Sequence, residues 1–399
     1  MTKGRDLPPL RLLPGEERRI ESGHAWVFSN EVDTTKTPLG DFAPGSMASV
    51  VSSRDRFLGY AYVNPQVLIC ARILGRNAAE PPGRALLEQR LRRALALRER
   101  LYARPYYRLV YGESDGLPGL VLDRYGDLVV GQSGTAGIDA MADDIVAAVR
   151  AVIGAKQFVW KNDSGARELE QLPETVTADS GAVPDETGVE ENGLSFRAPL
   201  AAGQKTGWFY DQTGNRAMLR RHVKGARVLD VCSYVGGWGI SAAENGARDV
   251  LCVDASATAL GYVERAATAR SLPVRTLRGD AFDALEDLAA AGERYDVVVL
   301  DPPAFIKRRK QAAKGEAAYR RLNQLGLQLV ADDGLLVSCS CSYHLEPQSL
   351  LDALQKAARN TGRFVQVIET GGQAPDHPVH PAIPETRYLK AFFCRVTQE

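Results

Sequence analysis

The sequence has no hydrophobic run long enough to cross a membrane and no apolar signal core near its start. A membrane-spanning helix needs about 20 consecutive apolar residues, and no stretch of the chain approaches that length. The opening residues, MTKGRDLPPLRLLPGEERRIESGH, also lack the apolar core of a secretory signal. From these absences we expect a cytoplasmic protein that has no membrane as a partner.

Cysteine is scarce and is not spaced for metal binding. The six cysteines form no CxxC motif, and no histidine lies at metal-ligand spacing from them. We therefore expect no zinc site, and in a reducing compartment most of these side chains should be small and buried. The six are Cys70, Cys232, Cys252, Cys339, Cys341 and Cys394. The pair in LLVSCSCSYHL stands one residue apart, and that spacing requires a chemical explanation.

The chain also has no excess of one charge, no internal repeat and no low-complexity segment. Its 49 basic residues balance its 49 acidic residues, so the overall charge does not indicate a nucleic-acid partner. Two segments are locally basic: Arg84–Arg104 holds seven arginines and two glutamates, and Lys307–Arg321 holds seven basic residues and one acidic residue. Such clusters can follow phosphates, although a solvated helix face explains a single charge run equally well.

The length of 399 residues allows two or three domains, and the pattern along the chain favours three. Residues 1–75 contain short β-strand patterns separated by turn residues, which predicts a small β-barrel or sandwich. Residues 76–188 follow the linker GRNAAEPPG and predict a central α+β domain. Its elements are a long amphipathic helix (Arg84–Ala103), two strands around a glycine-rich connection, a helix near Ile138–Ile153 and a strand QFVWKN. The polar stretch TADSGAVPDETGVEENG is expected to separate this domain from the last one.

Residues 189–399 alternate strands with helices. The expected strands are ARVLDVC, DVLCVDAS, VRTLRGD, YDVVVLDPP and GLLVSCSCS. Nearly continuous apolar strands separated by helical spacing are typical of a parallel, doubly wound, Rossmann-like α/β sheet. In this class, ligands bind at the carboxyl ends of the strands.

Side chains at three successive strand ends suggest a ligand for this domain. Asp230 precedes a glycine-rich turn, where a carboxylate repels a pyrophosphate but can hold a cationic amino-acid group. Asp254, at the end of the second strand, is placed to accept hydrogen bonds from ribose hydroxyls. Asp280, after the third strand, can receive an adenine amino group. S-adenosylmethionine (SAM) has these three parts and no phosphate, so we expect it as the cofactor.

The predicted cofactor contacts in this segment also include the turn itself. Glycines let the backbone pass close to a ligand at a helix N-terminus, but tight turns also need glycine for packing alone, and a dinucleotide would use a similar turn. The three aspartates could also be helix N-caps, an explanation that is better for one of them than for all three. The further predicted contacts are Ser233, Tyr234, Gly236, Gly237 and Ala281.

A resemblance makes the expectation narrower. VLDVCSYVGGWGISAAENGARDVLCVDAS resembles the opening motifs of class I SAM-dependent methyltransferases. GQKTGWFYDQTGNR, DPPAF and SCSCS resemble the bacterial 23S rRNA (cytosine-C5)-methyltransferase family that carries an N-terminal PUA domain. RIESGHAWVFSNEV resembles that family's PUA opening, GESDGLPGLVLDRYGD its central domain and DHPVHPAIPETRYLKAFFCRV its C-terminal strands. The resemblance spans motifs from about Leu13 to Val396. It implies that the entrance to the SAM site is formed by Lys205, Thr206, Gly207, Asp211, Gln212 and Arg216.

The sequence DPPAF ends a buried strand at the edge where ligands bind. Pro302 and Pro303 stop the strand and make a rigid loop, so Asp301 should face both the transferred methyl group and the substrate. In methyltransferases this loop grips an exocyclic amine in one form and uses the acid against the edge of a pyrimidine in another. Phe305 is displaced by one residue from the simplest amine-methylating pattern.

Methylation at cytosine C5 requires a nucleophile, and SCSCS supplies a cysteine on the next strand. C5 becomes reactive when a thiolate adds to C6. Cys339 and Cys341 project to the same side of a strand, and Cys341 is nearer the carboxyl edge. It also precedes YHLEPQSLLDALQKAAR, a helix whose N-terminus can stabilise a thiolate. The resemblance aligns Cys341 with the family's nucleophile and leaves Cys339 as a core residue. Other cytosine-C5 enzymes carry a second cysteine where this chain has Ala304.

The sequence therefore predicts a three-domain RNA cytosine-C5 methyltransferase, with 23S rRNA as its substrate by resemblance. The target base must leave its stack to be reached. The residues expected against the RNA are Pro302, Pro303, Phe305, Lys307, Arg308 and Arg309. The alternatives are a guanine or adenine N-methyltransferase, or a non-catalytic RNA-binding assembly factor. The sequence leaves open whether the chain acts as a monomer or as a homodimer.

Overall fold

The computed structural model describes residues 7–398, and these residues divide into two units. The first unit contains the chain up to Thr187, together with Pro199–Trp208 and Pro375–Thr386. The second contains Gly188–Ala198, Phe209–Ala374 and the chain from Arg387 onward. Within the described residues, no helix combines the length and the apolar character that are needed to cross a membrane.

The N-terminal part of the first unit is a five-stranded sheet in the order β1-β3-β4-β5-β2. Its strands are β1 (Pro9–Arg11), β2 (Trp26–Val27), β3 (Ser46–Val51), β4 (Phe57–Val63) and β5 (Ala71–Gly75), with helix α1 (Glu17–Glu21) between the first two. The strand expected from WVFSNEV is cut short after two residues. Glu31 turns back to accept a hydrogen bond from the Phe28 backbone N–H at 2.7 Å and pairs with Arg19, which closes a 3₁₀ turn instead of extending the strand.

The rest of the first unit is a second five-stranded sheet in the order β10-β9-β8-β7-β6. Its strands are β6 (Tyr106–Tyr111), β7 (Leu120–Tyr125), β8 (Leu128–Ser133), β9 (Gln157–Asn162) and β10 (Thr175–Ala178). Its helices are α2 (Arg84–Leu101), α3 (Ala136–Ala140), α4 (Ala142–Ile153) and α5 (Ala166–Leu169). The expected strand pair is in fact three strands, because Gly126 has φ +66 and allows a tight hairpin between β7 and β8. The single helix expected at Ile138–Ile153 is two helices, which meet at Met141.

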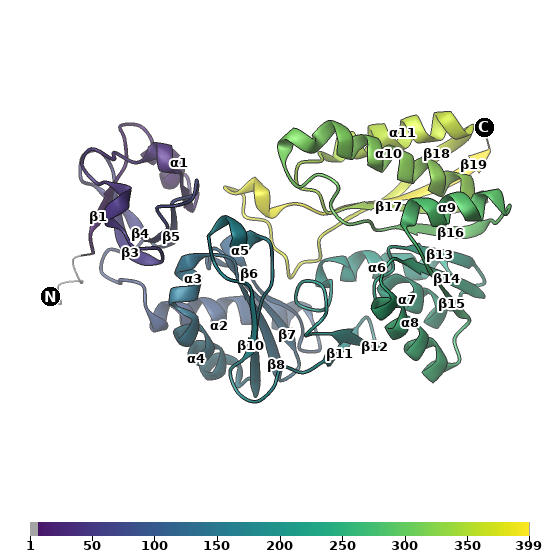
Figure 1. Cartoon of the computed structure of the whole chain (residues 1–399), viewed down its shortest axis with the longest axis horizontal. Helices are drawn as coiled ribbons and strands as arrows, with labels where there is room; N and C mark the ends of the chain where they lie inside the picture. The colour runs from purple at the N-terminus through teal and green to yellow at the C-terminus, as the bar shows by residue number, and fades with distance from the viewer. Residues whose placement is uncertain (1–6, 399) are drawn as a thin grey trace. The chain divides into compact units, whose positions relative to one another are not determined.

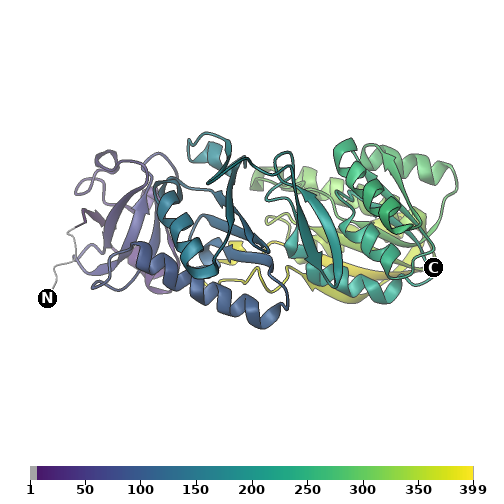
Figure 2. The same cartoon turned by 90° about the horizontal axis from the view of Figure 1, so that it is seen from below.

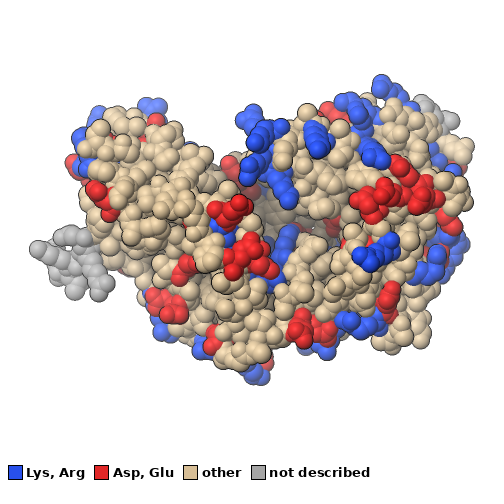
Figure 3. All heavy atoms as spheres, viewed as in Figure 1, with Lys and Arg blue, Asp and Glu red and all other residues tan. Residues whose placement is uncertain are grey.

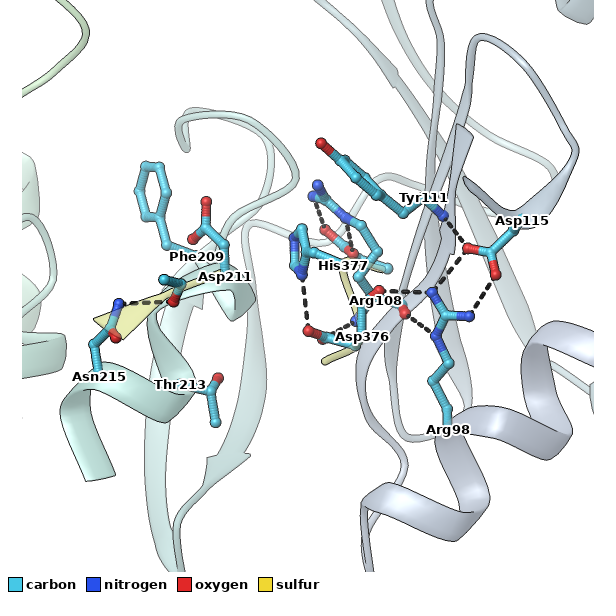
Figure 4. A network of polar contacts seen from close by, with 12 residues as sticks. Arg98, Arg108, Tyr111, Asp115, Phe209, Asp211, Thr213, Asn215, Asp376 and His377 are labelled. Carbon is cyan, nitrogen blue, oxygen red and sulfur yellow. Dashed lines mark hydrogen bonds and ion pairs between the residues drawn. The ribbon is translucent and has the colours of Figure 1, made fainter. Parts of the chain in front are cut away.

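A buried polar network holds the segment Pro375–Thr386 within the first unit (Figure 4). Arg98 is fully buried and pairs with Asp115 at 2.6 and 2.8 Å, and it donates a third hydrogen bond to the Asp376 carbonyl oxygen at 2.6 Å. The Asp376 carboxylate accepts from the backbone N–H of Arg108 at 2.8 Å. The basic residues of α2 therefore do not all lie on one solvated face, because Arg98 is buried in the interior of this unit.

The second unit begins with a hairpin and continues into a seven-stranded sheet in the order β15-β14-β13-β16-β17-β19-β18 (Figure 1). The hairpin strands are β11 (Glu186–Glu191) and β12 (Leu194–Pro199). The polar stretch expected to separate the central domain from the last one thus contains β11. The sheet strands are β13 (Arg227–Val231), β14 (Asp249–Asp254), β15 (Val274–Arg278), β16 (Tyr295–Leu300), β17 (Val330–Ser340), β18 (Arg363–Gly372) and β19 (Lys390–Gln398).

Helices cover both faces of this sheet, which gives a doubly wound, Rossmann-like unit (Figures 1 and 2). One face carries α6 (Thr213–Leu219), α7 (Gly237–Glu244) and α8 (Ala257–Arg270), and the other carries α9 (Ala281–Ala290), α10 (Ala312–Leu329) and α11 (Pro347–Thr361). The sheet is parallel except for β19, which runs antiparallel to both of its neighbours. Strand order reverses between β13 and β16, so the crevice expected to bind a ligand lies at their carboxyl ends.

Candidate functional site

Asp230 lies on β13 just before the glycine-rich turn and is fully buried. One carboxylate oxygen accepts a hydrogen bond from the Gly239 backbone N–H at 2.8 Å. The other has no hydrogen-bond partner among residues 7–398. Burial raises the pKa of Asp230 to about 7. A buried acceptor without a partner is costly, and a cationic amino group would satisfy it.

The glycines of the turn after Asp230 serve internal packing and also leave the backbone open to a ligand. Gly236 has φ +82, a left-handed conformation that side chains rarely adopt. A Cβ added to Gly239 would lie 2.4 Å from Cys252 Sγ, and one added to Gly237 would lie 2.8 Å from Arg216 Cζ. Both explanations for the glycines therefore apply together. The segment remains able to approach a ligand, but its helix also packs too closely for larger residues.

Asp254 and Asp280 are already bonded to the backbone at the ends of β14 and β15. The Asp254 carboxylate accepts from the N–H groups of Tyr234 at 2.9 Å and Ser256 at 2.8 Å. Asp280 is exposed and caps α9 by accepting from the Phe282 N–H at 2.8 Å, with Ala281 as the first helical residue. The N-cap explanation thus accounts for Asp280 structurally. Each carboxylate oxygen can accept more than one hydrogen bond, so these contacts leave capacity for a ligand.

Asp301 follows β16 and is fixed by two side chains from other elements. Gln212 Nε2 donates to one carboxylate oxygen at 2.8 Å, and Trp238 Nε1 donates to the other at 3.0 Å. Burial raises the pKa of Asp301, while its bond to Trp238 and the charge of Arg216 act in the opposite direction. Trp238 was missed by sequence reasoning, although an indole inside GGWG is an unusual residue for a turn built of small side chains.

The residues expected to form the SAM entrance do not form one cluster within a single unit. Lys205 and Thr206 belong to the first unit, where the Thr206 hydroxyl donates to Asp123. In the second unit, Arg216 is buried against Glu191 with two hydrogen bonds of 3.0 Å. Asp211 accepts a hydrogen bond from the Tyr388 hydroxyl. Of the remaining predicted contacts, Ser233 is buried in the turn and bonds through its backbone N–H to Val253.

The two cysteines of SCSCS have different surroundings. Cys339 lies within β17 and is 1% exposed, and burial raises its pKa well above the ordinary value. Cys341 comes directly after the last residue of β17 and is partly exposed. Its Sγ lies 4.0 Å from the Pro302 carbonyl oxygen, in the loop that follows Asp301. The structure therefore brings a partly accessible thiol beside the DPP loop and keeps the other thiol in the core.

Helix α11 begins later than the sequence suggested. We expected the helical segment to start at Tyr343, but its first helical residue is Pro347, with Glu346 as N-cap. Between Cys341 and the helix, the chain is fixed by Ser342, whose hydroxyl bonds to the Tyr319 hydroxyl at 2.9 Å and accepts from the Ile306 N–H at 3.1 Å. This intervening turn weakens the argument that the helix N-terminus stabilises the Cys341 sulfur.

The loop after Asp301 combines a packed aromatic ring with exposed cations. Pro302 is buried and Pro303 exposed, and the Phe305 ring lies 4.8 Å from that of Tyr319. Lys307, Arg308, Arg309 and Lys310 follow it and are all exposed. Figure 3 shows Lys and Arg side chains gathered over this loop and the start of α10. The structure thus leaves these charges accessible to an anionic partner.

A second set of arginines in the first unit has the character of a cationic patch. Burial together with the charges of Arg93 and Arg76 lowers the pKa of Arg90 to about 10. Like charges repel one another, and an anion would relieve the repulsion. In the same helix, by contrast, Arg84 and Arg92 both pair with Glu88.

Two family models match the chain. A PUA-like domain matches residues 10–76, and an S-adenosylmethionine-dependent methyltransferase matches residues 171–394. The crystal structure of SMU.776 complexed with SAH shares the fold, with a TM-score of 0.82 at 20% identity, covering 98% of this chain and 100% of that one. Trm5b from Pyrococcus abyssi is more distant, with a TM-score of 0.51 at 18% identity, covering 69% of this chain and 74% of that one.

These matches define the chain as a SAM-dependent methyltransferase with a PUA-like N-terminal domain. Among curated relatives, Ribosomal RNA large subunit methyltransferase I of Cronobacter sakazakii is 34% identical, and the alignment covers 97% of this chain and 99% of the relative. The protein of the same name from Pseudoalteromonas atlantica is 33% identical, with 96% and 98% covered. The chain belongs to the ribosomal RNA large subunit methyltransferase I family. The expected fold class and cofactor are thereby confirmed.

Proposed function

We propose that this protein transfers a methyl group from SAM to C5 of a cytosine in ribosomal RNA, specifically 23S rRNA, through a covalent adduct with Cys341. The observation that carries the proposal is the partly exposed Cys341 sulfur beside the loop of Asp301. The names of the full-length relatives support ribosomal RNA as the substrate. We assign the reaction to the cytoplasm, where ribosomal RNA is assembled into ribosomes.

The proposed chemistry needs a thiolate because C5 of cytosine is a weak nucleophile. Attack of the Cys341 thiolate on C6 forms a C–S bond and moves the C5–C6 π pair toward C5. SAM supplies the methyl group that the activated carbon accepts. Loss of the C5 proton to a base and cleavage of the C–S bond then restore the aromatic ring and the thiolate.

Asp301 is proposed to contact the polar edge of the cytosine. Two donors, Gln212 and Trp238, hold its carboxylate in a fixed orientation, which supports a positioning role for those two side chains. Because burial raises the pKa of Asp301, the carboxyl group is able to take up a proton and donate a hydrogen bond to N3 of the ring. Such a bond draws electron density from C6 and favours thiolate addition.

The proposed SAM contacts follow the strand ends of the second unit. The unpartnered oxygen of Asp230 fits the ammonium of the methionyl group, Asp254 fits the ribose and Asp280 the adenine amine. The backbone of Ser233–Gly237 and the first turn of α9 at Ala281 are proposed to line the same ligand. Asp211, Gln212, Arg216, Lys205 and Thr206 retain the roles that the family resemblance implies.

RNA is proposed to bind through its phosphates and through an unstacked target base. Exposed Lys307, Arg308 and Arg309 follow the DPP loop, which supports phosphate contacts there, with Pro303 and Phe305 beside the flipped base. Arg90 and Arg93 are proposed as a second phosphate contact. We retain three domains, at residues 1–75, 76–188 and 189–399, with the first two binding RNA.

A trapping experiment tests the proposed function. RNA carrying 5-fluorocytosine at the target should be methylated once and remain attached, because fluorine cannot leave C5 as a proton does. With SAM present, a protein–RNA adduct should survive denaturing electrophoresis for wild type and for Cys339→Ser. Cys341→Ser should give neither adduct nor methylated RNA, because a hydroxyl is a poor nucleophile at neutral pH.

Three results would contradict the proposal. If Cys341→Ser methylates RNA at the wild-type rate, the target is an exocyclic amine of guanine or adenine rather than C5 of cytosine. If wild type fails to bind SAM in a calorimetric titration, the chain is a non-catalytic RNA-binding factor. If the adduct disappears with Cys339→Ser instead, the nucleophile is Cys339, within β17.

A further inference from the structure

Lys390 is a buried cation whose backbone and side chain lie beside the residues on either side of Cys341. It is the first residue of β19 and is 8% exposed. Its backbone lies opposite Ser340 in the antiparallel β17–β19 pair. Its ammonium donates to the Ser342 carbonyl oxygen at 2.6 Å and to the Tyr388 carbonyl oxygen at 2.8 Å. The side chain thus contacts the residue after Cys341, while its backbone faces the residue before it.

The contacts of this ammonium are with backbone carbonyls rather than with a carboxylate. Burying a charge without an opposite charge costs more than burying a neutral donor, and a neutral side chain would satisfy two carbonyls as well. The pKa of Lys390 is lowered to about 8, chiefly by burial; a thiolate at Cys341 and the carboxylate of Glu346 act to raise it, and the charge of Arg387 acts to lower it. Opposite charges at Lys390 and Cys341 therefore stabilise each other.

The other side of the same turn is neutral. Ser340 and Ser342 both bond to the Tyr319 hydroxyl at 2.9 Å, and burial raises the pKa of that hydroxyl, which keeps it protonated. Cys339 is a buried thiol, and Asp301 is the acid nearest in the chain to the Pro302 carbonyl that Cys341 contacts. Within this set of groups, Lys390 supplies the positive charge.

We propose that Lys390 is the positioning residue that holds Cys341 as a thiolate ready for attack. The thiol proton passes to solvent, and the resulting negative sulfur is offset by the ammonium across the strand pair. When sulfur bonds to carbon its charge is lost, and the ammonium remains bonded to the two carbonyls. This inference rests on the proposed role of Cys341 as nucleophile and names the group that prepares it.

The test compares two substitutions that separate charge from hydrogen bonding. Lys390→Gln keeps a donor for the carbonyls but removes the charge, and Lys390→Met removes both. The rate of alkylation of Cys341 by iodoacetamide is measured against pH by mass spectrometry of the peptide that carries Cys341. Both variants should shift the midpoint of the profile upward by about 1–3 pH units, the effect of an adjacent opposite charge. Lys356→Gln, an exposed lysine on α11, should leave the midpoint unchanged.

The result that overturns the inference is a Lys390→Gln profile that coincides with wild type, because Lys390 would then be only a hydrogen-bond donor. SAM affinity and thermal unfolding are measured on each variant; if Lys390→Met does not fold, Lys390→Gln alone decides. Alkylation requires neither RNA nor methyl transfer, so a failed 5-fluorocytosine trap with a shifted profile would reject the proposed function and keep the charge pairing. A wild-type midpoint at or above that of an ordinary cysteine would also reject the inference.

Discussion

At the scale of single residues, the site combines acids with side chains that restrict them. Asp301 has both oxygens occupied by Gln212 and Trp238, so it is held in place and is not able to swing toward solvent. Asp230 has one oxygen without a partner among the described residues. Asp301 is therefore held in its orientation before any ligand binds, whereas the hydrogen bonding of Asp230 is completed only by a ligand.

Replacing Asp230 tests this difference. Asp230→Asn should weaken SAM binding about 10- to 150-fold, which corresponds to about 1.5–3 kcal/mol for a hydrogen bond between charged groups. Because the pKa of Asp230 is about 7, wild-type affinity should rise between pH 6 and pH 8 as the carboxylate ionises, and the variant should lose this rise. Calorimetric titration across that range measures both effects. Asp287→Asn, an exposed position on α9, serves as the control, and an unaltered pH dependence in Asp230→Asn would exclude the assignment.

The same acid links pH to stability. Its pKa in the folded protein lies above the ordinary value of 3.8, so the folded state holds the proton more tightly than the unfolded chain does. The stability that this group contributes is present below about pH 4 and is lost as the pH rises through about 7. Asp230→Asn should therefore flatten the pH dependence of the free energy of unfolding in that window.

At the scale of elements, α10 and the loop before it divide their residues between core and surface. Tyr319, Leu322 and Leu329 of α10 are buried in the core of the second unit, whereas Lys307, Arg308 and Arg309 in the preceding loop are exposed. The basic run is therefore exposed and available to a phosphate backbone.

Neutralising the loop tests its contact with RNA. Substituting Lys307, Arg308 and Arg309 together by glutamine should lower the slope of log affinity against log salt by about 2, since each phosphate contact on a single strand contributes about 0.7. Fluorescence anisotropy with an rRNA fragment over a salt series gives this slope. The matched control replaces Lys356 and Arg359 on α11, which are exposed cations outside the loop. A slope equal to that of wild type would mean that the loop cations are solvated and do not contact RNA phosphates.

At the scale of the whole molecule, the chain passes between its two units more than once. Pro375–Thr386 belongs to the first unit, although Ala374 before it and Arg387 after it belong to the second. Asp376 anchors this excursion by accepting from the Arg108 N–H, and it is fully buried (Figure 4). The stability of the first unit therefore depends on residues close in sequence to β19, the strand that carries Lys390.

Removing the anchor should destabilise the first unit and spare the cofactor site. Asp376→Ala leaves a buried N–H without its acceptor and should lower the free energy of unfolding by about 1–3 kcal/mol. Glu385→Ala, at an exposed position in the same segment, should change it little. Denaturant titration measures the loss, and calorimetry should give wild-type SAM affinity for both variants. Equal stability of the two variants would mean that the segment is not held by Asp376.

The local sequence determined much of the parallel sheet in the second unit. The apolar runs that contain Asp230, Asp254 and Asp301 predicted β13, β14 and β16 to within three residues at each end, because a buried parallel strand is encoded by its own consecutive side chains. It also placed the glycine-rich turn and the DPP loop at the carboxyl edge, since parallel strands share one edge.

Only the tertiary structure decided which side chains meet. Trp238 and Gln212 reach Asp301 from different elements, and Lys390 reaches the turn of Cys341 from β19. No local pattern encodes such contacts, because they depend on strand order and on the antiparallel register of β19 against β17. The later start of α11 has a similar origin: Ser342 bonds to Tyr319 of α10 and Lys390 of β19. The sequence thus determined the chemical groups, and long-range packing decided which of them act together.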